Sequence, residues 1–184
     1  LVPNIVHLVF IHDGPMYPYS FVNFLAVMHH LKPEAIYVHC YTEPTGPYWK
    51  RIKSIAPIKV HTLVGNLSIH GISPKPNDYA HQSDIVRLTA LIEHGGIYLD
   101  TDVLIMKSLD RFKYNSMTMG QENPWKLGNA VMLAAKNSSF MRKWYEEYRD
   151  VNFNCWGCHS LKRPMVLSKK FPKLVNVVPR VSFF

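Results

Sequence analysis

The chain has 184 residues, and with 47% hydrophobic and 18% charged residues its composition is that of a folded globular protein and excludes an intrinsically disordered one. Its 21 lysines and arginines outnumber 13 acidic residues, and the net charge of +8 favours anionic partners, although a basic, solvated surface would explain it equally. Because no run of five like charges occurs, nucleic acid is not an expected partner, and no apolar segment approaches the ~20 residues that span a bilayer.

In the first half of the chain, apolar runs alternate with segments of helical periodicity. Strands are predicted at residues 4–11, 35–41 and 58–64, and helices at residues 19–32 and 46–56. The next segment, residues 65–77, contains Gly, Pro, Asn and Ser and is predicted to be a loop. A helix is then expected at residues 78–96, where two glycines end it.

The second half continues this alternation. The stretch "GGIYLDTDVLI" at 95–105 predicts a strand, and further strands are expected at 116–122, 129–135 and 174–179, with helices at 138–150 and 163–172. Strands that alternate with helices predict an α/β fold with a largely parallel sheet. Since no repeat or low-complexity linker interrupts the chain, residues 1–184 are expected to form one domain.

Two aspartates, Asp100 and Asp102, end the apolar run "IYLDTD". In open α/β sheets, ligands bind beyond the carboxyl ends of the strands, and period-two alternation would turn both carboxylates to the same side. Two like charges this close require a cation or a proton, and two oxygen ligands suit Mg²⁺ or Mn²⁺, which could bridge a diphosphate. Aspartates that cap a turn are the structural alternative.

The preceding helix carries two charged residues, Asp84 and Arg87, among apolar neighbours on one face. Arg87 could brace a carboxylate of the Asp-Thr-Asp motif or hold a phosphate with its planar fork, and Asp84 could accept hydrogen bonds from sugar hydroxyls. A solvated ion pair that contributes little is the alternative.

The three cysteines are Cys40, Cys155 and Cys158. The last two have CxxC spacing, but no second CxxC exists to complete a structural zinc site. A disulfide or plain buried thiols are the expected states, with metal or redox chemistry as the alternative.

The string "YLDTDV" also fits the way in which phosphatases of the haloacid-dehalogenase type present their nucleophile. Those enzymes need further carboxylates downstream for Mg²⁺, whereas the only later aspartates here are Asp110 and Asp150. This argues against phosphoryl transfer.

The segment "AHQSDIVRLTALIEHGGIYLDTDVLIMKSLD" resembles the pattern A-x-x-S-D-x-x-R-x(7)-G-G-x-Y-x-D-x-D of DXD-motif glycosyltransferases. That group includes α-1,4-galactosyltransferases, initiating α-1,6-mannosyltransferases and the glucosylating domains of large bacterial toxins. "PNIVHLVFI" is similar to the first strand of the family. The resemblance implies a GT-A-like (Rossmann-like) fold, with a mixed, largely parallel sheet flanked by helices.

The resemblance also implies roles for individual residues. Asp100 and Asp102 would hold a divalent metal, commonly Mn²⁺ or else Mg²⁺, and Asp100 would also contact the ribose. Asp84 and Arg87 would bind the hydroxyls of the donor sugar and position the phosphates. The nucleoside pocket would be lined, mainly through backbone atoms, by Val9, Phe10 and Ile11.

Residues later in the chain are predicted from their place at strand ends. Glu122 and Asn129 are expected near the acceptor and, with Asp84 and Arg87, form the predicted catalytic set; surface roles are the alternative. His159 is a candidate phosphate or metal ligand, with a structural role as the alternative. The family usually shows a Gly-Pro pair where this chain has "GCHSLKRP", and related proteins continue into a segment that covers the donor, so a C-terminal truncation at Phe184 would leave the site incomplete.

The expected function is that of a metal-dependent, retaining glycosyltransferase. It would transfer a hexose or N-acetylhexosamine from a nucleotide sugar, with a UDP-sugar favoured and GDP-mannose second, to a glycan or glycolipid. A non-catalytic domain that binds nucleotide sugars or glycans with the same fold is the alternative. The expected location is the Golgi lumen, near the membrane, through an N-terminal anchor of a type II protein that is absent from this chain.

Overall fold

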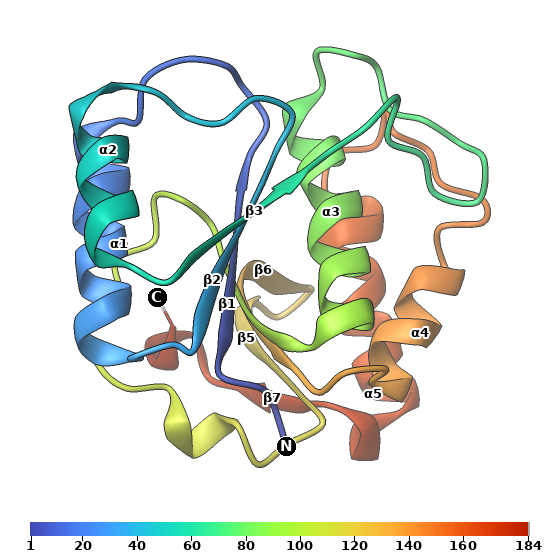
Figure 1. The fold of residues 1–184 in the computed structure, drawn as a ribbon. Helices are drawn as coiled ribbons and strands as arrows, with labels where there is room; N and C mark the ends of the chain where they lie inside the picture. Colours follow the sequence, from blue (N-terminus) through green and yellow to red (C-terminus); the bar gives the residue numbers. More distant parts are fainter. Residues whose placement is uncertain (184) are drawn as a thin grey trace.

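The computed structural model describes residues 1–183, which form a single α/β domain built on one sheet of strand order β3-β2-β1-β4-β6-β5-β7 (Figure 1). The strands are β1 (Ile5–Phe10), β2 (Ala35–Cys40), β3 (Ile58–Thr62), β4 (Gly96–Leu99), β5 (Met117–Asn123), β6 (Lys126–Ala134) and β7 (Asn176–Val178). Only β6 runs antiparallel to its neighbours, β4 and β5, and the other pairings are parallel. The predicted mixed, largely parallel sheet is confirmed.

Helices cover both faces of this sheet (Figure 1). One face carries α1 (Pro18–His30) and α2 (Gly46–Ile55), and the other carries α3 (Tyr79–His94), α4 (Ser139–Glu146) and α5 (Arg163–Lys170). Helices α1, α2 and α5 each have a proline in the first turn, where its missing N–H is not needed. Among residues 1–183, no helix combines the length and the apolar character that crossing a bilayer requires.

Alternation along the strands divides the buried side chains into two cores. In β1, Leu8 and Phe10 pack with α1 and α2, whereas Val9 packs on the opposite face with α3. In β4, Leu99 belongs to the first core and Tyr98 to the second. The strands that carry the site are therefore held from both sides.

The predicted helices and strands are present, and three details differ. Strand β4 ends at Leu99, so Asp100 and Asp102 lie in a turn and not in an alternating strand; the period-two argument for their orientation was wrong. Helix α4 ends at Glu146, after which the N–H groups of Tyr148 and Arg149 donate to carbonyls three residues back. A π-helical turn, Cys158–Lys162, was not predicted.

The order of the strands reverses beside β1. The chain moves from β1 to β2 and β3 with α1 and α2 on one face, and then α3 crosses the other face and returns it to β4, on the far side of β1. The carboxyl ends of β1 and β4 thus flank a topological switch point, which is where open α/β sheets bind ligands.

Candidate functional site

The site is built around Arg87, which lies on the inner face of α3. Its Nε lies 3.4 Å from Oδ1 of Asp84, one turn earlier, and its Nη1 lies 3.3 Å from Oδ1 of Asp100, just beyond β4. Nη1 also donates to the backbone oxygen of Asn129 at 3.0 Å, and the amide Nδ2 of Asn129 donates to Oδ1 of Asp84 at 2.9 Å. Three elements, α3, β4 and β6, thus bring four of the predicted site residues together.

This network is buried, since Asp84 and Arg87 are each only 6% exposed. Burial raises the pKa of Asp84, and the neighbouring charge of Arg87 opposes that shift. Burial alone would lower the pKa of Arg87, but the acidic groups around it, including Asp100 and Asp84, raise it. A solvated ion pair, the alternative reading of Asp84 and Arg87, is therefore wrong.

Tyr98 contacts both Asp100 and Arg87 of the network, and it was not predicted as a site residue from the sequence. Its hydroxyl donates to Oδ1 of Asp100 at 2.7 Å, and the guanidinium of Arg87 lies 4.6 Å from the centre of its ring. No pattern in the sequence gives the direction of a tyrosine hydroxyl, so this contact was not predictable.

The two aspartates of the Asp-Thr-Asp turn have different surroundings. The backbone of Asp100 is fixed, since its N–H donates to Ala130 and its carbonyl accepts from Asn23 Nδ2 at 3.2 Å. Asp102 is exposed. Across residues 1–183, no group of three or more His, Cys, Asp or Glu side chains could enclose a metal. Asp100 and Asp102 supply two carboxylates. These ligands fit Mg²⁺ or Mn²⁺ when water and substrate phosphates complete the coordination of the metal.

The polar network forms one side of a pocket of about 210 Å³. Asp84, Arg87, Asp100 and Asn129 line it together with residues of α3 and of the segment after α4, namely Ala80, His81, Trp156, Gly157, Ser160 and Leu161. Trp156 and Ser160 were not predicted as site residues. The CxxC spacing drew attention to their segment, but nothing in the sequence placed it against α3.

The other predicted site residues lie outside this pocket. The side chains of Val9, Phe10 and Ile11 are buried in the two cores, so contact with a nucleoside would involve their backbone. Glu122 is partly exposed on β5 and does not line the pocket. The ring nitrogens of His159 are buried and have no hydrogen-bond partner among residues 1–183.

The cysteines take the first of the states expected for them. Cys155 and Cys158 form a disulfide, and Cys40 is a buried free thiol. The disulfide closes the short loop that carries Trp156, so it belongs to the wall of the polar pocket.

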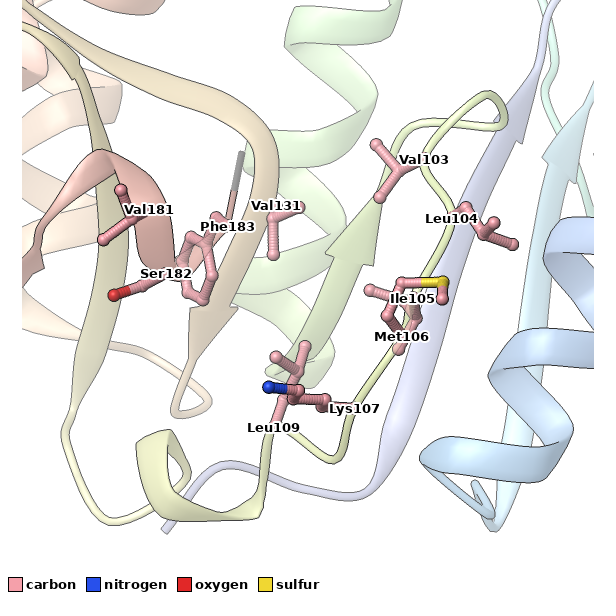
Figure 2. Close-up of a pocket in the computed structure, with 10 residues that line it drawn as sticks. All are labelled: Val103, Leu104, Ile105, Met106, Lys107, Leu109, Val131, Val181, Ser182 and Phe183. Carbon is pink, nitrogen blue, oxygen red and sulfur yellow. The ribbon is translucent and has the colours of Figure 1, made fainter.

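A second pocket, of about 330 Å³, begins directly after the Asp-Thr-Asp turn (Figure 2). One wall is formed by residues 103–107 and Leu109, and the other comprises Val131 and the C-terminal residues 181–183 (Figure 2). Most of its lining side chains are aliphatic or aromatic, and apart from Lys107 and Ser182 it lacks the charged and amide groups that line the polar pocket. The polar pocket is therefore the better candidate for a site that binds a sugar nucleotide.

Comparison with known proteins finds relatives of this chain among the glycosyltransferases. A family model described as glycosyltransferase sugar-binding region containing DXD motif matches residues 28–126. The whole chain is 32% identical to glucan organizing enzyme 1 of Cryptococcus neoformans and covers 54% of that protein. Some 46% of the chain is 30% identical to glycosyltransferase afumC of Aspergillus fumigatus, of which it covers 26%. The chain thus spans about half the length, or less, of these curated relatives.

A solved structure shares the fold. The PaToxG glycosyltransferase superposes with a TM-score of 0.68, over 93% of this chain and 70% of that one, at 13% sequence identity. The expected GT-A-like fold is therefore confirmed, while identity this low carries no information about substrates.

Proposed function

The chain belongs to the family of glycosyltransferases with a DXD motif, and on that basis we propose that it is a metal-dependent, retaining glycosyltransferase. It transfers a hexose or an N-acetylhexosamine from a nucleotide sugar to a glycan or glycolipid. The observation that carries this proposal is the convergence of Asp84, Arg87, Asp100 and Asn129 on one pocket beside the switch point of the sheet.

In this proposal each residue of the pocket has a distinct task. Asp84 binds hydroxyls of the donor sugar. Asn129 was expected near the acceptor, but because its amide donates to Asp84 it is proposed to bind the donor sugar too, through the amide oxygen that this bond does not use. Arg87 holds Asp84 and Asp100 in place. The backbone after β1, at Val9, Phe10 and Ile11, contacts the nucleoside. Positioning and electrostatics supply most of the rate enhancement.

The metal would be held by Asp100 and Asp102 and would offset the charge of the departing diphosphate. During transfer, the bond between the anomeric carbon and the diphosphate oxygen breaks and the acceptor oxygen bonds to that carbon. The acceptor's proton leaves with the diphosphate. Glu122, on β5, is proposed to contact the acceptor rather than the donor.

The favoured donor is a UDP-sugar, with GDP-mannose second. We propose that the protein works in the Golgi lumen, near the membrane, through an anchor outside this chain. The disulfide between Cys155 and Cys158 supports an oxidising compartment, since disulfides persist in the secretory pathway and are rare in the cytosol.

The test is calorimetric titration of UDP and of GDP, with and without Mn²⁺, into the wild type and Asp102→Ala. Asp150→Ala is the matched control, because Asp150 is also an exposed aspartate but lies far along the chain from the turn. We expect one nucleotide to bind only with Mn²⁺, and this binding to be lost in Asp102→Ala and retained in Asp150→Ala.

Transfer to a panel of glycan and glycolipid acceptors then separates the enzyme from a binding module. Binding that is independent of Mn²⁺, without turnover of the nucleotide sugar, would favour the non-catalytic alternative. If neither UDP nor GDP binds, the proposed function is wrong.

A further inference from the structure

Trp156 is a large aromatic residue at the mouth of a polar pocket. It is 70% exposed, yet it lines the same pocket as Asp84, Arg87, Asp100 and Asn129. Its ring lies edge-on to that of His81 on α3, with the centroids 5.7 Å apart. Since an exposed tryptophan gains little from packing, its place in this wall suggests a ligand.

The loop that carries Trp156 is fixed at several points. The disulfide joins the residues on either side, Cys155 and Cys158, and Gly157 has a φ of +67°, which only glycine adopts readily. After the loop, the π-helical turn is anchored where Trp144 Nε1 donates to the carbonyl of His159 at 2.7 Å. Trp156 is therefore presented on a constrained loop and not on a free one.

The rest of this wall also faces the polar network. Ser160 is 7% exposed and lines the same pocket as Asp84, so the turn after the loop adjoins the network. His81, which supports the indole, is itself fixed by a 2.6 Å contact between its Nδ1 and Oδ2 of Asp78. The indole and the carboxylates thus line one and the same pocket.

The chemistry of that space matches a sugar ring. A hexose presents hydroxyls at its edge and C–H groups on its faces, so it needs hydrogen-bonding groups on one side and an aromatic surface on the other. Asp84 and Asn129 offer the former and Trp156 offers the latter. A nucleobase fits this pocket less well, because a stacked base does not need the carboxylates of Asp84 and Asp100 and the guanidinium of Arg87 that line it.

We propose that Trp156 is a sugar-binding residue, which packs its indole against the C–H face of the transferred hexose while Asp84 and Asn129 bind the hydroxyls. The disulfide-closed loop constrains the position of the indole in the wall of the pocket. The inference rests on the proposed function and deepens it, because it assigns recognition of the sugar, as opposed to the nucleotide, to a specific side chain.

The test compares a nucleotide sugar with its sugar-free nucleotide. UDP-galactose, UDP-N-acetylglucosamine and UDP are titrated with Mn²⁺ into the wild type, Trp156→Ala and Trp156→Phe; GDP-mannose and GDP replace them if the wild type prefers guanosine. We expect Trp156→Ala to weaken binding of the preferred nucleotide sugar roughly tenfold, the effect of one aromatic contact, and to leave the affinity for the free nucleotide within about twofold. Trp156→Phe should restore most of the affinity.

Trp125→Ala is the matched control. Trp125 is 73% exposed, close to the value for Trp156, but it lies at the turn between β5 and β6 and does not line the pocket. The Trp125→Ala variant should bind both the nucleotide sugar and the free nucleotide as the wild type does. The double variant Cys155→Ser/Cys158→Ser should lose affinity for the nucleotide sugar selectively, as Trp156→Ala does.

Each other outcome has a defined meaning. If Trp156→Ala binds both ligands as the wild type does, or loses both equally, Trp156 does not recognise the sugar and the inference is wrong, while the proposed function stands. If the double cysteine variant keeps full affinity, the loop does not need its disulfide to position the indole. If the wild type binds no nucleotide, the proposed function fails, and the inference built on it fails with it.

Discussion

The Nη1 atom of Arg87 lies 3.3 Å from Oδ1 of Asp100, so an ion pair joins helix α3 to the turn beyond strand β4. The same guanidinium also lies 3.4 Å from Asp84, which places one cation between two carboxylates. These carboxylates are 16 residues apart in the sequence and come from different elements. Arg87 therefore fixes the relative position of the groups proposed to bind the sugar and the metal.

Replacing Arg87 should destabilise the protein strongly. Arg87→Met leaves Asp84 buried without its cation, and we expect the free energy of unfolding to fall by about 3–5 kcal/mol, as for other broken buried pairs. Arg87→Lys keeps the charge but not the planar fork, so its loss should be intermediate. Urea denaturation measures both. A loss below about 1 kcal/mol in Arg87→Met would place the network among weak surface pairs.

Replacing Asp102, in contrast, should change the free energy of unfolding very little. Because it is exposed, Asp102→Asn should leave the free energy of unfolding within about 0.5 kcal/mol of the wild type in metal-free buffer. Asp84→Asn, at a buried position paired with Arg87, should cost clearly more. Urea denaturation of the two variants, with EDTA present, gives the comparison. Equal losses would show that Asp102 has a structural partner.

Much of this fold could be predicted from the sequence, because its elements are local patterns. Alternating apolar residues specify the strands, and prolines and glycines mark the ends of helices such as α1 and α3. Details that depend on tertiary context were not predictable. Strand β4 stops at Leu99 although apolar residues continue to Ile105, and the π-helical turn at Cys158–Lys162 has no sequence signature that was recognised.

The same distinction between local patterns and tertiary packing applies to the residues of the site. Asp84, Arg87 and Asp100 could be predicted because they lie within one stretch of helix, glycine pair and strand, whose spacing is itself the signal. Trp156 could not, because it reaches the pocket through packing of a distant loop on α3. The partnership of Tyr98 with Asp100 depends on a hydroxyl direction that no pattern reveals.

Acid should destabilise the protein through two buried histidines on the α3 face of the sheet. His7 Nδ1 and His39 Nε2 lie 3.0 Å apart, and burial lowers the pKa of His7 to about 4 and that of His39 to about 3. In the unfolded chain both histidines have a pKa of about 6.5, so below that pH the unfolded state binds more protons than the native state. Stability is complete above about pH 6.5 and is lost as the pH falls toward the native pKa values.

The expected loss between about pH 7.5 and about pH 5 is about 2 kcal/mol per histidine, measured by urea denaturation at both pH values. His39→Gln should reduce this dependence on pH, whereas His29→Gln, at an exposed position of α1, should retain it. An identical dependence in His39→Gln and the wild type would rule out His39 as a source.

Gly95, between α3 and β4, gives a prediction for which Gly65, in the loop after β3, is the control. Gly95 and Gly65 share a φ of +67°, but a Cβ at Gly95 would lie 2.5 Å from the backbone nitrogen of Lys136, whereas at Gly65 nothing lies within 4 Å. Both alanine variants should lose about 1–3 kcal/mol to backbone strain. Gly95→Ala should lose more, because the backbone of Lys136 must also move. Denaturation midpoints that are equal for the two variants would contradict this.

The bond between Cys155 and Cys158 closes on itself within four residues, so it secures one wall of the pocket without crossing to the sheet. Side chains in that wall can change while the strand pairing and the ion pairs of Arg87 stay as they are. The ion pairs of Arg87 and the indole that is proposed to contact the sugar thus lie in separate segments of the chain. Residues 155–158 are accordingly the segment whose exchange would change the proposed sugar contact without touching the sheet.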